Sequence, residues 1–134
     1  MLTVSTDDDL LDVGLVHRWL SEDAYWSLGR SRETVERSLR HSVNLGAYED
    51  GRQVGFLRIV TDRSTFAWVC DVYVDPAARG QSVGKLLMAE ADQLLRSYGV
   101  RRALLATADA HGLYAQHGFE PLRDPDRWME RGYQ

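Results

Sequence analysis

Two spacings of apolar residues alternate along the chain, and each predicts a different kind of element. Segments with apolar residues at every second position, or in unbroken runs of β-branched and aromatic residues, predict strands. They are residues 2–6, 44–49, 53–61, 65–74, 100–107 and 119–122. Segments with apolar residues three or four positions apart predict helices. The first predicted helix follows residues 7–9 and includes Val13, Val16 and Leu20. The others are residues 31–42, 83–98 and 109–117.

The order of these elements predicts the fold class. It reads strand, two helices, three strands, helix, strand, helix, strand. Asp50-Gly51 between two strands is a common hairpin turn, whereas the helix of residues 83–98 forms a strand–helix–strand crossover. A chain with both kinds of connection is expected to form an α+β (mixed α/β) fold, in which a central, mostly antiparallel mixed sheet carries helices on both faces.

Length and composition narrow the class of protein. The 134 residues contain no repeat or linker and predict a single domain, residues 1–134. A net charge of −4, from 16 Lys and Arg against 20 Asp and Glu, excludes a generally basic nucleic-acid binder.

No apolar stretch approaches the ~20 residues of a membrane span, and the acidic N-terminal segment lacks a signal-peptide pattern, so a cytoplasmic protein is expected. The single Cys70 and four histidines without a metal-ligand spacing predict no disulfide framework and no metal site.

A loop between a predicted strand and a long predicted helix carries the clearest chemistry. Gly80 and Gly84 allow the backbone to approach a ligand closely. The amide groups at a helix start have no partner within the helix, and together with the helix dipole they form a phosphate site. Arg79 and Lys85 add positive charge. The alternative is an ordinary connection that only needs flexible turn residues.

The spacing in this loop disfavours nucleotides. The interval from Gly80 to Gly84 is one residue too short for a Walker loop, and Leu86 replaces the Ser or Thr that would hold magnesium. The loop does not match the GxGxxG pattern of dinucleotide-binding proteins either. ATP and dinucleotides are therefore not the expected ligands.

Two motifs resemble those of the GNAT family of N-acetyltransferases. The sequence Arg79-Gly80-Gln81-Ser82-Val83-Gly84 is similar to the family pattern Gln/Arg-x-x-Gly-x-Gly/Ala, which follows a strand. Downstream, Leu113-Tyr114-Ala115-Gln116-His117-Gly118-Phe119 matches the family's Leu-Tyr-x-x-x-Gly-Phe. The element order between the motifs also agrees. The resemblance covers the second half of the chain closely and the first half by element order only.

Two positions depart from the family pattern. Ser82 stands where glycine is usual, and its backbone N–H remains available to a ligand provided that φ is negative there. Thr107 stands where many members carry an Asn that helps to hold the pantetheine arm of the cofactor. The resemblance implies that this contact passes to Thr107 and Asp109.

The resemblance implies acetyl-CoA as cosubstrate and an amine as acceptor, with direct attack of the amine. It also implies that the strand before the loop splays from its neighbour and offers main-chain groups to the cofactor. The cofactor-binding residues implied are Val72, Tyr73, Val74, Arg79, Gly80, Gln81, Ser82, Val83, Gly84, Lys85, Thr107 and Asp109.

Acetyl transfer to an amine requires proton transfers. An alkylamine with a pKa of about 10.4 is neutral in only about one molecule in 2,500 at pH 7, so a base or a site that lowers this pKa is needed. The motif places the Tyr114 hydroxyl beside the CoA sulfur as a general acid. Asp71 is the carboxylate expected to act as base, with a pKa raised by partial burial. A structural role for Asp71, a water chain from Asp71, and Cys70 as an acyl-carrying nucleophile are the alternatives.

The acceptor is expected between the loop of residues 21–30 and the strand ends. Tyr25 and Trp26 offer aromatic walls there for an amine or cation, and the alternative is that they only cover the core. The expected partner is a small-molecule amine or a peptide or protein N-terminus. A homodimer is also expected, because the sheet edge after Pro121 is incomplete. A catalytically silent CoA-binding module and another phosphate-ligand protein are the competing functions.

Overall fold

A five-stranded sheet forms the centre of the computed structural model, which describes residues 1–133. The strands are β1 (Leu2–Ser5), β2 (Val43–Glu49), β3 (Arg52–Thr61), β4 (Phe66–Val74) and β5 (Arg102–Leu104), and they are neighbours in that order. The first four pair antiparallel, and β5 is parallel to β4. The predicted class, a mostly antiparallel mixed sheet, is confirmed.

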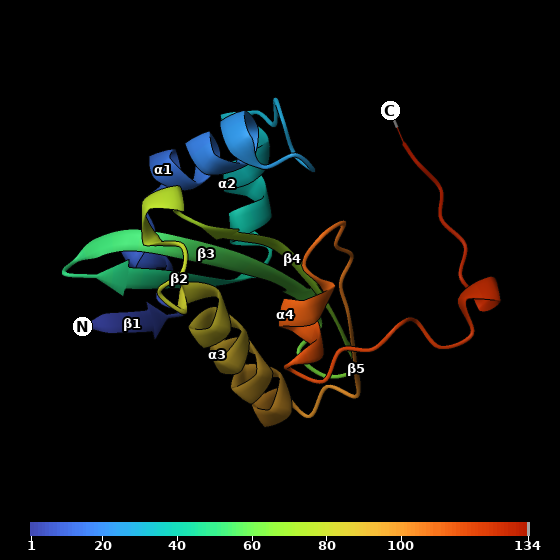
Figure 1. Cartoon of the computed structure of the whole chain (residues 1–134). Coiled ribbons are helices and arrows are strands. Elements are labelled where there is room, and N and C mark those ends of the chain that lie inside the picture. Colours follow the sequence, from blue (N-terminus) through green and yellow to red (C-terminus); the bar gives the residue numbers. More distant parts are fainter. Residues whose placement is uncertain (134) are drawn as a thin grey trace.

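Helices cover both faces of this sheet, as the sequence predicts (Figure 1). On one face lie α1 (Val13–Arg18), which continues into a π-helical turn at Trp19–Asp23, and α2 (Arg32–Arg40). On the other face lie α3 (Val83–Tyr98) and α4 (His111–Ala115). Within residues 1–133, no helix has the length and hydropathy that a membrane span requires.

Each face of the sheet has its own hydrophobic core. The core under α3 contains Leu57 and Ile59 of β3 together with Leu87 and Met88 of the helix. The core under α1 and α2 contains Val16, Val35 and Phe56. The two cores hold both helix layers to one sheet, so the loops at the sheet ends have fixed positions relative to each other.

Several predicted element ends are confirmed by the local geometry. The Ser31 hydroxyl accepts from the Thr34 amide and begins α2. Gly99 ends α3 in the left-handed conformation, with φ 75°, and donates its N–H to a carbonyl of the last turn. Asp50 and Gly51 both have positive φ, as a tight hairpin turn requires.

The structure differs from the prediction near the C-terminus. Residues 119–122 form no strand, since no strand in the described part of the chain lies beside them, and the paired part of β5 is limited to three residues, Arg102–Leu104. Asp109 does not cap α4. The Thr107 hydroxyl accepts from the Ala110 amide at 3.0 Å instead, and the helix begins at His111.

Gly55 in β3 allows the start of α3 to lie close against the sheet. A Cβ at this position would lie 2.8 Å from Val83 Cγ1 and 3.1 Å from Leu87 Cδ1. Both distances are shorter than an ordinary van der Waals contact. The position of the α3 N-terminus therefore depends on the absence of a side chain at Gly55.

The variant Gly55→Ala should lower the free energy of unfolding by about 1–3 kcal/mol, because the added methyl group overpacks the contact between β3 and α3. Urea unfolding measures this change. Gly112→Ala is the matched control, since a Cβ at Gly112 in α4 meets nothing within 4 Å and should leave stability unchanged or slightly raised. Equal stability of both variants would contradict the close approach.

Candidate active site

The sheet opens between β4 and β5. Their parallel pairing runs from Phe66 opposite Arg102 to Trp68 opposite Leu104 and stops there. β4 continues to Val74, paired only with β3 on its other side. The edge of β4 beyond Trp68 therefore has backbone groups available to an extended ligand, as the family resemblance implies.

A bulge in β4 lies beside this opening. The register with β3 passes from Arg58 opposite Cys70 to Phe56 opposite Tyr73, so two residues of β4 face one of β3. Asp71 in the bulge has φ 54°. The extra residue reverses the alternation of side chains, because Val69 lies in the core under α3 and Tyr73 lies in the core under α1 and α2.

The bulge places the Asp71 carboxylate in a buried cluster of donors. Arg30 Nη1 lies 2.7 Å and Arg58 Nε 3.0 Å from the same oxygen, Oδ2. Trp26 Nε1 donates to the other oxygen, Oδ1, at 2.8 Å. The cluster joins β3, the bulge of β4 and the loop between the π-helical turn and α2.

The sequence predicts a raised pKa for Asp71, and this prediction is wrong. Burial would raise this pKa, but the hydrogen bond from Arg30 and the charges of Arg58 and Arg30 outweigh burial and hold the pKa of Asp71 below its usual range. A carboxylate that is ionised and shared between two guanidinium groups is a weak base. The geometry favours the structural alternative for Asp71 over the role of general base.

The thiol of Cys70 does not have the character of a nucleophile. Burial raises the pKa of Cys70 to about 11, more than the nearby charge of Arg58 lowers it. The side chain is therefore a neutral thiol near pH 7, whereas reactive cysteines are thiolates. An acyl-cysteine route has no support in this environment.

The loop after β4 presents free backbone donors. Asp75 accepts from the Ala77 amide and begins a 3₁₀ turn, Pro76–Ala78, that leads toward α3. At the start of α3 the first helical bond runs from the Leu86 amide to the Ser82 carbonyl. Within residues 1–133, the four amides of residues 82–85 have no hydrogen-bond partner, and no side chain caps the helix. Four such N–H groups at the start of a sixteen-residue helix suit a phosphate.

Ser82 adopts the conformation that glycine favours. Its φ is 67° and its ψ 19°, so the condition of a negative φ is not met. Its N–H nevertheless has no hydrogen-bond partner within residues 1–133. Gly80 has a positive φ of 82° as well. The serine thus keeps the left-handed turn, at a conformational cost of about 1–2 kcal/mol relative to glycine.

The two basic side chains of the loop have different surroundings. Arg79 turns back onto β4, where its Nε donates to the Val74 carbonyl at 3.1 Å and its guanidinium lies 5.4 Å from the centre of the Tyr73 ring. Lys85 is exposed in the first turn of α3. Gln81 is exposed as well. Lys85 therefore adds a positive charge on one of the four residues whose amides are free.

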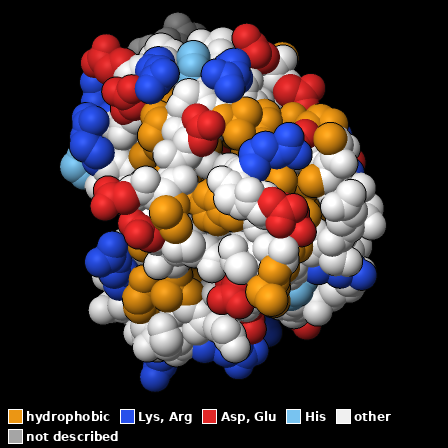
Figure 2. All heavy atoms as spheres, turned by 90° about the vertical axis from the view of Figure 1, so that its left-hand side faces the viewer, with side chains coloured by type: hydrophobic (Ala, Val, Ile, Leu, Met, Phe, Trp, Pro, Cys, Tyr) orange, Lys and Arg blue, Asp and Glu red, His pale blue; other side chains and the backbone are white. Residues whose placement is uncertain are grey.

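Side chains of mixed charge surround the hydrophobic patches on the face shown in Figure 2. Acidic and basic groups are interspersed there rather than separated into large fields. A net charge of −4 therefore does not oppose a local anion site.

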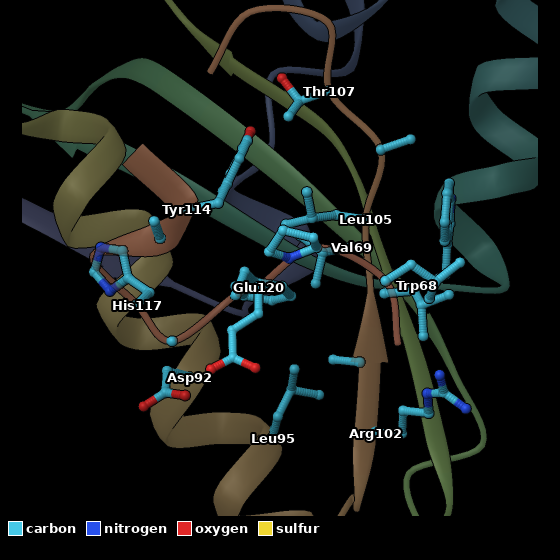
Figure 3. Close-up of a pocket in the computed structure, with 18 of the residues that line it drawn as sticks. Trp68, Val69, Asp92, Leu95, Arg102, Leu105, Thr107, Tyr114, His117 and Glu120 are labelled. Carbon is cyan, nitrogen blue, oxygen red and sulfur yellow. The ribbon is translucent and has the colours of Figure 1, made fainter. Parts of the chain in front are cut away.

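Tyr114 stands on α4 at the other side of the opening. Its ring is buried and packs edge-on against Phe119, with 6.3 Å between ring centres. Figure 3 shows its hydroxyl directed toward Thr107, on the loop that follows β5. Burial, with smaller contributions from Tyr25 and Asp109, raises the pKa of Tyr114 above its ordinary value. The phenol is protonated near neutral pH and can donate a proton.

Tyr25 and Trp26 reach the same opening from the first half of the chain. Their rings are in an edge-to-face arrangement 5.0 Å apart, and they are 55 % and 42 % exposed. The Tyr25 hydroxyl accepts from the Ala108 amide at 3.0 Å and so bridges to the loop after β5. The predicted aromatic walls thus lie between the Asp71 cluster and the loop that contains Thr107.

Val72, Tyr73 and Val74 contribute backbone rather than side chains to the opening. The Tyr73 ring lies in the core under α1 and α2, 5.1 Å from the centre of Trp19. Its hydroxyl donates to Asp23, and burial followed by this hydrogen bond raises the pKa of Tyr73 to about 12. Val72 and Val74 pack toward α3.

Sequence reasoning missed the roles of two arginines. Arg58 lies in β3 between the buried Leu57 and Ile59, and a charge within an apolar strand is a signal that it has a buried partner. Arg30 follows the aromatic pair in the loop, and no local pattern shows that it reaches Asp71, 41 positions away.

A mixed sheet that opens between β4 and β5, beside a helix that begins with free amides, has the form of an acetyltransferase fold. The family model described as "Acetyltransferase (GNAT) family" matches residues 14–119 of this chain. The chain belongs to this family, and the resemblance drawn from its two motifs is confirmed.

The chain is similar to several known proteins. A Xanthomonas campestris crystal structure assigned to the GNAT family is 46 % identical, with a TM-score of 0.93 over 99 % of this chain and 94 % of that one. A Gibberella zeae protein assigned as an acetyltransferase is 29 % identical over 92 % of this chain and 81 % of its own length. Chloroplastic serotonin N-acetyltransferase 2 of Oryza sativa is 32 % identical over 87 % of this chain, which spans 59 % of that protein.

The variant Asp71→Asn should lower the free energy of unfolding by about 3–5 kcal/mol near pH 7, because it leaves two arginines without their buried counter-charge. The folded pKa of Asp71 is lowered, so its contribution to stability is complete above the unfolded pKa of about 3.9 and is lost as pH falls through the folded value. Urea unfolding from pH 7 to about pH 2 should therefore show a constant difference between the two proteins down to about pH 4 and a shrinking difference below it.

Asp92→Asn is the control for this measurement. Asp92 pairs with Arg96 on the exposed side of α3, and the change should alter stability by less than about 1 kcal/mol. If Asp71→Asn were as mild as Asp92→Asn, the buried cluster would not be a major source of stability.

Proposed function

We propose that this protein transfers an acetyl group from acetyl-CoA to the amine of an acceptor by direct attack. The opening between β4 and β5 carries this proposal, because the free amides of residues 82–85 lie on one side of it and Tyr114 on the other. Membership of the acetyltransferase family supports it. The proposal treats residues 1–134 as one acetyltransferase domain that acts in the cytoplasm.

The residues at the opening suit a CoA thioester. The edge of β4 at Val72–Val74, where Arg79 occupies only the Val74 carbonyl, can pair with the amide groups of a pantetheine arm as an added strand would. The unpartnered amides at the start of α3 can bind a pyrophosphate, and Lys85 adds a positive charge in the same turn. The proposed cofactor site consists of Val72, Tyr73, Val74, Arg79, Gly80, Gln81, Ser82, Val83, Gly84, Lys85, Thr107 and Asp109.

Two residues of this proposed site, Thr107 and Arg79, already have partners within the chain. Thr107 already accepts hydrogen bonds from Asp109 and Ala110, so only its hydroxyl proton is available to the cofactor. Arg79 is held over the Tyr73 ring, where it stabilises the loop and must turn outward to contact a phosphate. We therefore assign most of the anion binding to the backbone.

Tyr114 is the proposed general acid. When bound, acetyl-CoA supplies the acyl group and a thiolate leaving group. The phenol is protonated because burial raises the pKa of Tyr114, and it can give its proton to the leaving sulfur. Main-chain N–H groups of β4 polarise the thioester carbonyl.

Asp71 acts in this proposal as a positioning residue. Its hydrogen bond to Trp26 and its ion pair with Arg30 hold the aromatic loop at the mouth of the opening. The proton that the attacking amine loses goes to water at this mouth, because Arg30 and Arg58 hold the pKa of Asp71 below its usual range.

A small aromatic amine is the acceptor class that we favour. Tyr25 and Trp26 form exposed aromatic walls, whose ring faces can pack against an aromatic acceptor or attract its amine. The similarity to a serotonin N-acetyltransferase supports this class. Peptide and protein N-termini are the other acceptors to be compared.

The function is tested with the purified chain and acetyl-CoA. At 100 times its Kd, acetyl-CoA should stabilise the fold by ~2.7 kcal/mol, and ATP should have no comparable effect. Thiol release should then be measured over a panel of arylalkylamines, alkylamines and peptides. Stabilisation without turnover on any amine would indicate the silent CoA-binding alternative, and stabilisation by ATP alone would contradict the proposal.

The variant Tyr114→Phe should lower kcat by about 10²–10⁴-fold and leave the Kd for acetyl-CoA within about twofold, because it removes only the acidic proton. Steady-state thiol release and titration calorimetry measure the two quantities. Tyr98→Phe, near the end of α3, is the control and should keep wild-type kcat. An unchanged kcat in Tyr114→Phe would remove this residue from the mechanism.

A further inference from the structure

The cluster around Asp71 holds more positive than negative charge. Arg30 and Arg58 both contact the same carboxylate oxygen, at 2.7 Å and 3.0 Å. Within residues 1–133, no second carboxylate forms an ion pair with either arginine. Two guanidinium groups are always charged in proteins, and they face one carboxylate. One positive charge of the cluster is therefore not balanced.

Most of the hydrogen-bond donors of Arg30 are unused. A guanidinium has five N–H donors, and Arg30 uses only its Nη1, which donates to Asp71. Its Nε and Nη2 have no partner within the part of the chain that the structure describes. These two nitrogens form one edge of the planar group, and their parallel N–H bonds match the two oxygens of a carboxylate.

Arg58 has less to offer a ligand. Its Nε donates to Asp71, and its Nη1 donates to the Ser42 hydroxyl at 3.0 Å. Only Nη2 is without a partner among residues 1–133. Arg58 can therefore add its charge and one donor, whereas Arg30 offers a complete edge.

The free donors lie between the buried carboxylate and the surface. The side chain of Asp71 is 2 % exposed, but those of Arg58 and Arg30 are 15 % and 22 % exposed. Trp26, which donates to the same carboxylate, is 42 % exposed. A ligand that packs against the Trp26 ring can reach Arg30, while Asp71 stays covered.

Apolar surface continues from the two arginines along the sheet. Val60 follows Arg58 by two positions in β3, and Trp68 of β4 lies directly opposite Val60. These three side chains point to the same face of the sheet. Val60 and Trp68 are 41 % and 36 % exposed. In Figure 3 the Trp68 side chain lies on the opposite side of β5 from Tyr114. The site thus combines a cation with apolar surface.

A purely structural cluster would not need both arginines. One guanidinium is enough to balance the charge of Asp71. A second one, also partly buried, costs further desolvation and places two like charges on one oxygen. An anionic group of a ligand offsets both costs, because it supplies the missing negative charge.

We propose that the acceptor amine also carries a carboxylate, which the Nε and Nη2 of Arg30 bind in a bidentate contact with support from the charge of Arg58. This inference rests on the proposed function, since it specifies the acceptor of that site. The aromatic or apolar body of the acceptor packs against Tyr25 and Trp26. Aromatic amino acids and arylalkylamines with an acidic group are the acceptor class that this chemistry selects.

The first test uses an anion that has no amine, so its result does not depend on acetyl transfer. By titration calorimetry, 3-phenylpropionate should bind the wild type about 10–100-fold more tightly than the neutral 3-phenylpropionamide, because a charge-assisted bidentate contact distinguishes them. Arg30→Gln should reduce this preference to about twofold or less, and Arg30→Lys should give an intermediate value because it keeps the charge without the planar edge.

The second test measures kcat/KM for pairs of amines that differ only in their acidic group. Phenylalanine is compared with phenylalaninamide, and 4-(2-aminoethyl)benzoate with its carboxamide, so that the two pairs distinguish two positions of the carboxylate. The preference for the acid in one of the pairs should be about 10–100-fold lower in Arg30→Gln than in the wild type. Comparing the two proteins cancels the difference in amine pKa within each pair.

Arg32→Gln is the matched control. Arg32 lies two positions after Arg30, is 55 % exposed and pairs with Glu36 on α2, so the change removes the same charge without touching Asp71. Both preferences should remain as in the wild type.

A wild type that binds neither 3-phenylpropionate nor its amide, or binds both equally, would overturn the proposal even if amines are acetylated. A preference that survives in Arg30→Gln would overturn it too. The absence of turnover on every amine would instead contradict the proposed function, whereas the carboxylate site would stand on the calorimetry.

Discussion

A single buried carboxylate fixes the geometry on which the site depends. Asp71 must be ionised to satisfy Arg30 and Arg58, and it must be paired because an isolated charge in the interior is strongly unfavourable. The bulge in β4 supplies the reversal that brings this carboxylate to the face of α1 and α2. Without the extra residue, Tyr73 would leave its core, and the loop with Trp26 would lose its anchor on the sheet.

The two sides of the opening both offer backbone groups to a ligand, and different residues make this possible on each side. On the β4 side the backbone provides the binding groups, so the identities of Val72 and Val74 are free to serve the core under α3. At the start of α3, Gly55 permits the close approach and Ser82 provides the left-handed turn that leaves four amides uncapped. Each feature costs some stability, and together they preorganise donors for an anionic ligand.

Local signals in the sequence predicted local structure well. The start of α2 after Ser31, the Asp50-Gly51 turn and the end of α3 before Gly99 depend on interactions within a few residues, and they agree with the segments and the turn predicted there. The charge state of Asp71 depends on partners 13 and 41 positions away, so the rise in pKa expected from its apolar neighbours alone was wrong. The family motif predicts the loop and Tyr114 as site residues, but it could not show that Ser82 has a positive φ, because that depends on the backbone itself.

The strand predicted at residues 119–122 shows why a pattern of residues is insufficient at a sheet edge. A strand exists only with a neighbour, and in the described chain β5 has none beyond β4. The short β5 therefore has a consequence at the site, because its separation from β4 beyond Trp68 opens the proposed acetyl-CoA cleft. Three paired residues hold β5 weakly.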